Sequence, residues 1–275
     1  MTDSELGTHR LRFAYSTINW GETPDLAAAF AEIGDAGWSA VELFGHALDW
    51  LGPPRVLRDR LAGLRVATLF GVVALPTNPV QSTTLRHRID YAAEIGAEAF
   101  GLVGGNRLRW RPPLAEEYAE LARFCEELAI YGADQGVAVA YHPHVACTIE
   151  TADEIDRLLD HTRHLRLCLD VSHIALVGED PLAHLHAYYD RTAYIHLKDW
   201  ARGKFVELGQ GSLGIDFAAL LRELADREFP GWIVVEQSRS DVSPVQSATI
   251  NAHFLTDLGY DLGPATVEVN GRERS

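Results

Sequence analysis

Acidic and imidazole side chains stand at the points where predicted strands end. Asp170 closes the apolar run RLCLD, His196 closes AYIH and Glu236 closes WIVVE. A strand buried on both faces is an apolar run, and a charge at its carboxyl end costs free energy unless a partner compensates it. Neighbouring strand ends of this kind would form a ring of oxygen and nitrogen donors. The spacing therefore predicts a site for a divalent metal ion.

Ordinary structural roles compete with this interpretation. Asp170 would serve as an N-cap for the turn at 171–173, and His196 would be a core histidine bonded to backbone. Glu236 follows three β-branched residues and has no comparable alternative. We favour metal ligands because three strand ends repeat the pattern. His173, three residues after Asp170, is either a loop histidine or a group that reaches the same pocket.

The segment YHPHVACTIE leaves several roles open. His142 and His144 flank Pro143, which keeps the loop extended. Either histidine is a candidate metal ligand, catalytic base or substrate contact. Glu150, at the end of the segment, is either the fourth ligand or part of the start of the next helix.

Alternating apolar and amphipathic segments predict the elements that position these residues. Strands are predicted at 11–16, 40–44, 64–73, 99–103, 137–142, 165–170, 192–196 and 232–236, and helices at 24–36, 85–95, 114–134, 152–162, 217–227 and 244–258. Eight strands followed by helical segments indicate a single (β/α)8 TIM barrel over residues 1–275. A doubly wound open sheet would need a glycine-rich turn after the first strand, which YSTINWG does not offer. The tails at about 1–9 and 261–275 are expected to be flexible.

Composition narrows the classes of function. The 275 residues carry a formal net charge of −15 without a basic run, so nucleic-acid binding is not expected. Apolar runs are of strand length, and the amino-terminal residues lack the apolar stretch of a secretory signal, so no membrane association is expected. Three cysteines without zinc-finger spacing suit a reducing compartment. A cytoplasmic protein that binds a small molecule, as a homo-oligomer or with a small partner subunit, fits these properties.

Taken together, these motifs resemble a known family. The pattern of Asp170-x-x-His173, the segment HLKD from His196, Arg202 and Glu236 resembles the xylose-isomerase-like superfamily of the sugar phosphate isomerase/epimerase type. The segments INW (18–20), YHPH (141–144), HLKD (196–199) and GWIVVEQ (231–237) are most similar to its inosose dehydratase branch. The resemblance extends from the first strand to about residue 258.

The resemblance implies a Mn²⁺, Co²⁺ or Mg²⁺ ion held by two glutamates, an aspartate and a histidine, which here are Glu150, Asp170, His196 and Glu236. Epimerases of the superfamily place the first glutamate at the tip of strand five, where this chain has Tyr141 and His142. Their catalytic pair of glutamates is not recognisable here, which disfavours 3-epimerisation by two opposed glutamates.

The chemistry expected is removal of a proton next to a carbonyl of a keto-sugar or keto-cyclitol. His142 or His144 would be the base, with Glu236 as the rival. The substrate contacts would come from Trp20, His173, Lys198 and Arg202. Loss of a β-substituent would make the chain a lyase or dehydratase, and return of the proton would make it an isomerase or epimerase. A DNA-repair phosphodiesterase and a non-catalytic barrel subunit are the less favoured classes.

Overall fold

In the computed structural model, which describes residues 11–263, eight parallel strands close into a barrel in the order β1-β10-β7-β6-β5-β4-β3-β2. The strands are β1 (Arg12–Ser16), β2 (Ala40–Leu43), β3 (Arg65–Val73), β4 (Ala99–Gly104), β5 (Ala138–Tyr141), β6 (Arg166–Asp170), β7 (Thr192–Leu197) and β10 (Trp232–Val235). Strand β1 pairs with both β10 and β2, which closes the ring. The predicted TIM barrel is confirmed, and all eight strands agree with their predicted ranges to within one residue at each end.

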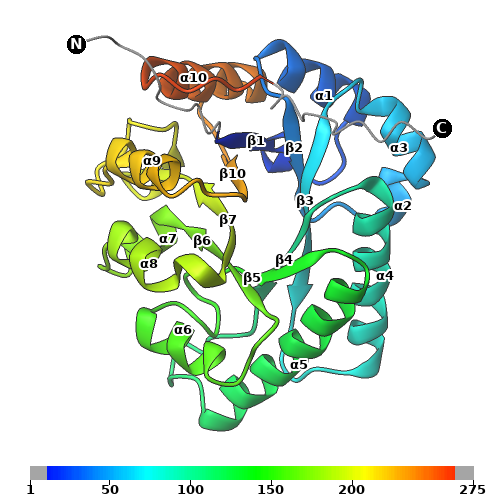
Figure 1. Ribbon diagram of the computed structural model, residues 1–275, viewed down its shortest axis with the longest axis vertical. Helices are drawn as coiled ribbons and strands as arrows, with labels where there is room; N and C mark the ends of the chain where they lie inside the picture. Colours follow the sequence, from blue (N-terminus) through cyan, green and yellow to red (C-terminus); the bar gives the residue numbers. More distant parts are fainter. Residues whose placement is uncertain (1–10, 264–275) are drawn as a thin grey trace, which may run out of the picture.

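Helices surround the barrel (Figure 1). Those that the sequence predicts are α1 (Leu26–Asp35), α4 (Pro79–Ile95), α5 (Ala115–Asp134), α6 (Ala152–Leu159), α9 (Phe217–Asp226) and α10 (Pro244–Asp257). Helix α4 begins earlier than predicted, because Asn78 caps it by accepting from the Gln81 N–H at 2.9 Å and Pro79 occupies its first turn. Its first turns are polar, so apolar periodicity did not reveal them.

Shorter elements complete the chain, and no ranges were predicted for them. They are the 3₁₀ turns η1 (Thr17–Trp20) and η2 (Tyr189–Arg191), the helices α2 (Leu48–Leu51), α3 (Pro54–Arg60), α7 (Val171–Leu176) and α8 (Pro181–Tyr188), and an antiparallel hairpin of β8 (Asp199–Ala201) and β9 (Lys204–Val206). The hairpin follows β7 directly, so it lies at the carboxyl end of the barrel.

Two apolar clusters stabilise the fold. The larger joins the outer faces of the strands to the helices, and the smaller fills the barrel with alanines and the large rings of Phe70, Tyr194 and Trp232. Gly101 leaves room for two of these rings, because a Cβ there would lie 2.3 Å from the Tyr194 hydroxyl and 2.6 Å from the Phe70 ring. The barrel interior is therefore packed with side chains rather than open.

No helix among the described residues is both long and apolar enough to cross a membrane. The segments 1–10 and 264–275, which contain most of the predicted flexible tails, lie outside the described residues.

Candidate metal centre

Four side chains at the carboxyl ends of adjacent strands converge on one point. Their ligand atoms all lie within 4.8 Å of one another, and the four form what we call the ligand group: His142, Asp170, His196 and Glu236. They come from the ends of β5, β6, β7 and β10, which are consecutive in the barrel. Asp170 pairs with His196, and Glu236 lies two residues beyond Val234, the β10 partner of His196, so the three side chains lie on the same face of the sheet. Each is at most 3% exposed.

One atom of each member lacks a hydrogen-bond partner in the described part of the chain. These atoms are Nδ1 of His142, Oδ2 of Asp170, Nδ1 of His196 and Oε2 of Glu236. Nδ1 of His196 lies 2.8 Å from Oε2 of Glu236, without hydrogen-bond geometry, and 3.8 Å from Oδ2 of Asp170. Ligand atoms that each lie about 2.1 Å from a shared metal ion would be about 3 Å apart when they are neighbours around the ion and about 4 Å apart when they lie on opposite sides of it. Unpartnered buried polar atoms are costly, so this convergence fits a metal ion.

The remaining atoms of the carboxylates are occupied. Oδ1 of Asp170 accepts from the N–H groups of Ser172 and His173 at 2.9 and 3.1 Å, which caps α7. Oε1 of Glu236 accepts from Nζ of Lys198 at 2.6 Å. The N-cap and the ligand interpretation of Asp170 are therefore compatible, because a different oxygen serves each.

The charge in and around the ligand group also favours a cation, because negative groups outnumber positive ones. The buried carboxylates of Glu42, Asp170 and Glu236 outnumber the ammonium of Lys198 beside them. Burial by itself would lower the pKa of His196, but Cys168, Glu42 and Glu236 reverse this and raise it, so without a cation the ring adds a second positive charge and one negative charge remains. A cation bound at Nδ1 would replace that proton, which leaves two negative charges for the cation to balance. Burial by itself would raise the pKa of Glu236, but Lys198 and His196 outweigh it and hold that pKa well below its usual value. A divalent cation would cancel the excess.

The imidazole of His142 is suited to be a ligand. Burial, followed by the charge of His196, lowers the pKa of His142 well below its usual value, so its ring is neutral and keeps a free lone pair. Burial would likewise lower the pKa of Lys198, but Glu236 and Asp170 reverse this and raise it, so the lysine stays charged.

Glu150 is not brought to the ligand group, contrary to the sequence-based assignment of a fourth ligand. The chain after Pro143 folds back in a turn, in which the His144 N–H donates to the Ile149 carbonyl at 3.1 Å and Ala146 adopts a left-handed φ of 66°. The Glu150 carboxylate consequently pairs with Nε of Arg107 at 3.0 Å. His142, the first residue after β5, occupies the remaining place.

His144 and His173 form a pair of rings beside the ligand group. Their centroids are 3.7 Å apart, and both rings lie about 5.5 Å from that of His142. Nδ1 of His144 lies 2.6 Å from the Val145 carbonyl, which only accepts, so Nδ1 carries the hydrogen and Nε2 is left unprotonated in the neutral ring. His144 is half-buried, whereas neither nitrogen of the buried His173 has a hydrogen-bond partner within residues 11–263, and its Nε2 lies 3.7 Å from Oδ2 of Asp170.

The predicted substrate contacts Lys198, Arg202 and Trp20 have different surroundings. Lys198 is buried against Glu236, with its ammonium 4.1 Å from the Phe205 ring centre. Arg202 is exposed at the turn of the β8–β9 hairpin with a φ of 53°, outside the ligand group. The indole N–H of Trp20 donates to Glu32 on α1 at 2.7 Å, so it is not free for a substrate.

Glu42 on β2 was not identified from the sequence. Its carboxylate is fully buried, and Oε2 lies 2.9 Å from Nε2 of His196, which belongs to a strand far from β2 in the barrel order. Thr68 donates to the same oxygen at 2.7 Å. The available signal was an acid inside AVELF, a run short and apolar enough to be a buried strand.

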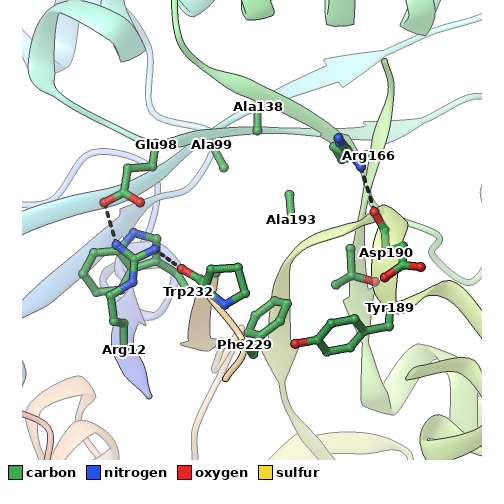
Figure 2. A pocket seen from close by; sticks show the side chains of 13 residues that line it. Arg12, Glu98, Ala99, Ala138, Arg166, Tyr189, Asp190, Ala193, Phe229 and Trp232 are labelled. Carbon is green, nitrogen blue, oxygen red and sulfur yellow. Dashed lines mark hydrogen bonds and ion pairs between the residues drawn. The ribbon is translucent and has the colours of Figure 1, made fainter. Parts of the chain in front are cut away.

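A cavity of about 420 Å³ lies at the opposite, amino-terminal end of the barrel (Figure 2). The charged groups there bond within the protein: Arg12 pairs with Glu98 at 2.8 Å, and Arg166 donates to the Asp190 carbonyl at 2.7 Å. Trp232 lies beneath the Arg12 guanidinium, 4.6 Å from its ring centre. The cavity is remote from the ligand group, and the guanidinium groups of Arg12 and Arg166 already donate within the protein, as suits the stabilising end of a barrel.

Comparison with known proteins agrees with this architecture. The family model described as "Xylose isomerase-like TIM barrel" matches residues 30–258. An inosose dehydratase of Geobacillus kaustophilus (strain HTA426) is 28% identical over 270 residues, covering 84% of this chain and 87% of the relative. One of Clostridium beijerinckii (strain ATCC 51743 / NCIMB 8052) is 26% identical, covering 84% and 91%.

Solved structures share the fold at lower identity. The crystal structure of the IOLI protein with a binding zinc atom aligns with a TM-score of 0.73 at 16% identity, covering 90% of this chain and 98% of that one. The 3-keto-D-glucoside 4-epimerase YcjR from E. coli aligns with a TM-score of 0.74 at 18% identity, covering 91% and 99%.

Proposed function

Because the chain belongs to the xylose isomerase-like TIM barrel family, we propose that it is a metal-dependent lyase that dehydrates a keto-cyclitol or a related keto-sugar. Relatives named inosose dehydratase that match most of its length support this substrate class, and the chain is an enzyme acting on carbohydrate-like molecules. The observation that carries the proposal is the convergence of four buried, unpartnered donor atoms at the carboxyl end of the barrel.

His142, Asp170, His196 and Glu236 would hold the metal ion. Bound there, a divalent cation supplies a Lewis acid that stabilises negative charge on a substrate oxygen as the neighbouring proton leaves. The donor set has two imidazoles and two carboxylates, so it is richer in nitrogen than the set expected from the sequence. The two imidazoles disfavour Mg²⁺, which prefers an all-oxygen set, while the two carboxylates suit Mn²⁺, and Co²⁺ binds a given mixed site more tightly than Mn²⁺; we therefore favour Mn²⁺ or Co²⁺.

His144 is the proposed base. Its Nδ1–H is bonded to the Val145 carbonyl, which leaves Nε2 able to accept a proton, and its half-buried ring remains accessible to a small molecule. In a dehydration, Nε2 takes the proton from the carbon next to the carbonyl. The imidazolium then gives that proton to the departing hydroxyl, so that a carbon–carbon double bond forms and water leaves. The ring of His173, 3.7 Å away, restricts the orientation of His144.

Glu236 is less suited to be a base. One of its oxygens accepts from Lys198 and the other lies in the ligand group. With Glu236 committed in this way, His144 is the free base, and an epimerisation that needs two opposed bases is not supported. Lys198, held charged beside the ligand group, would offset negative charge that develops on the substrate.

The test is activity of the chelator-treated full chain after addition of Mn²⁺, Co²⁺, Zn²⁺ or Mg²⁺. Keto-inositols and 3-keto-glycosides would be followed by NMR in ²H₂O, which reports both exchange of the proton next to the carbonyl and loss of the β-substituent. We expect elimination with Mn²⁺ or Co²⁺ and none in chelator. Full activity in exhaustive chelator, or no exchange with either substrate class, would contradict the proposal.

A further inference from the structure

Glu42 is a fully buried carboxylate beside the apolar cluster that fills the barrel. That cluster consists of alanines, Cys168, Val234 and three large aromatic rings. A charge in such surroundings costs several kcal/mol unless it is paired and hydrogen-bonded. Among the residues that the structure describes, its side chain bonds only to Thr68 and His196, and Oε1 has no hydrogen-bond partner, so the fold by itself gains little from an acid at this position.

The contact with His196 fixes which nitrogen of that ring carries hydrogen. An ionised carboxylate only accepts, so Nε2 of His196, at 2.9 Å from Oε2 of Glu42, carries a hydrogen. A metal ion at the ligand group would displace any proton from the other nitrogen, Nδ1, which then presents its lone pair. Nδ1 is the atom that lies 2.8 Å from Glu236 and 3.8 Å from Asp170, within the ligand group.

Glu42 is itself held firmly. Thr68 donates to Oε2 at 2.7 Å, and the hydroxyl of Thr17 donates to the backbone carbonyl of Glu42 at 2.9 Å. Its strand pairs on both sides, through Ser16 on β1 and Thr68 on β3. The acceptor for His196 is therefore fixed in place before any ligand binds.

We propose that Glu42 is a positioning residue for the metal ion. It holds His196 in the tautomer and ring orientation that aim Nδ1 at the ion, and its negative charge makes that nitrogen a stronger donor. The inference rests on the proposed function, since it requires that the ligand group binds a metal. Glu42, from the far side of the barrel, would thus be a fifth residue of the metal site, in addition to the ligand group, and would act through His196.

The direct test is the Mn²⁺ dissociation constant of the Glu42→Gln variant, measured by titration of the full, chelator-treated chain. Glutamine keeps the size of the side chain but removes the charge, and its amide can turn its NH₂ toward His196 and select the wrong tautomer. We expect Mn²⁺ to bind about tenfold to a hundredfold more weakly. Turnover should fall at limiting Mn²⁺ and recover at saturating Mn²⁺ with the substrate KM unchanged.

Two further variants complete the experiment. Glu98→Gln removes a carboxylate at the amino-terminal end of the barrel, where it pairs with Arg12 and Arg65, and should leave the Mn²⁺ affinity unchanged. Thr68→Val removes one hydrogen bond to Glu42 and keeps its charge, so it should weaken Mn²⁺ binding by roughly threefold to tenfold, which keeps the test available should Glu42→Gln not fold.

The outcomes are distinguishable. Wild-type affinity for Mn²⁺ in both Glu42→Gln and Thr68→Val, with only a loss of thermal stability, would overturn the positioning role and leave the proposed function standing. A wild-type chain that binds neither Mn²⁺ nor Co²⁺ would overturn both.

Discussion

Replacement of Lys198 by methionine should show how much uncompensated negative charge in the barrel lowers the free energy of unfolding. Nζ of Lys198 is 2.6 Å from Glu236 and 3.8 Å from Asp170, and all three side chains are at most 3% exposed. Methionine has a similar length but no charge. In the Lys198→Met variant, the buried carboxylates of Glu42, Asp170 and Glu236 would face no ammonium.

We expect a large loss in the free energy of unfolding, because solvent does not screen the pair of Lys198 and Glu236. Removing one partner of a buried ion pair costs about 3–5 kcal/mol. A domain of ordinary stability has roughly 5–15 kcal/mol in total, so Lys198→Met should be strongly destabilised in chelator. Ligand at a hundred times its dissociation constant adds about 2.7 kcal/mol of stability. Mn²⁺ should stabilise the variant more than the wild type, because the cation then meets an additional uncompensated charge.

The assay is urea unfolding of wild type, Lys198→Met, Glu236→Gln and the double variant, each with chelator and with Mn²⁺. The double variant removes both charges of the pair, so in chelator it should lose less stability than Lys198→Met alone. Two results would refute the reasoning that Lys198 and Glu236 form a buried pair that solvent does not screen. One is a loss of unfolding free energy below about 1 kcal/mol for Lys198→Met in chelator. The other is an equal loss in Lys198→Met and the double variant.

The remaining predictions concern the base and the alkaline limit of stability. His144→Ala should keep wild-type metal content but lower kcat by roughly a hundredfold to ten-thousandfold, as expected for loss of a general base, and a loss of metal instead would place His144 among the ligands. Burial, only partly offset by the hydrogen bond to Ser247, raises the pKa of Tyr15 to about 12, so the folded state favours the neutral phenol. The stability that the neutral phenol contributes is therefore complete below about pH 10, the pKa of tyrosine in the unfolded chain, and is lost as the pH rises toward about 12. Between these pH values, urea unfolding should show that Tyr15→Phe loses less of its free energy of unfolding than the wild type. An equal loss in both proteins would contradict this cause.

The barrel strands were predictable because strands buried on both faces are short apolar runs between turns. The run WIVVE, for example, fixes both the position of β10 and the placement of Glu236 at its end. The β8–β9 hairpin was not predictable in the same way. Its strands have three residues each and include Asp199 and Lys204, so neither length nor apolar pattern distinguishes them from a loop.

Within the site, the members of the ligand group that end β6, β7 and β10 were predicted, whereas the sequence left the role of His142 open and did not indicate Glu42. Asp170, His196 and Glu236 come together because parallel strands place their carboxyl ends at one end of the barrel, and because the register puts the three side chains on one face. The choice between His142 and Glu150 depends instead on the turn after Pro143. That turn uses a left-handed Ala146, a conformation that the sequence signals only when glycine is present.

Metal content of two matched variants tests the central claim most directly. His142→Ala removes a member of the ligand group, whereas Glu150→Ala removes the carboxylate that the sequence suggested and that the structure pairs with Arg107. Each protein would be saturated with Mn²⁺ and dialysed, and its metal would be counted by mass spectrometry. The account predicts that Glu150→Ala keeps the metal of the wild type and that His142→Ala loses most of it. Loss from Glu150→Ala with retention by His142→Ala would contradict it.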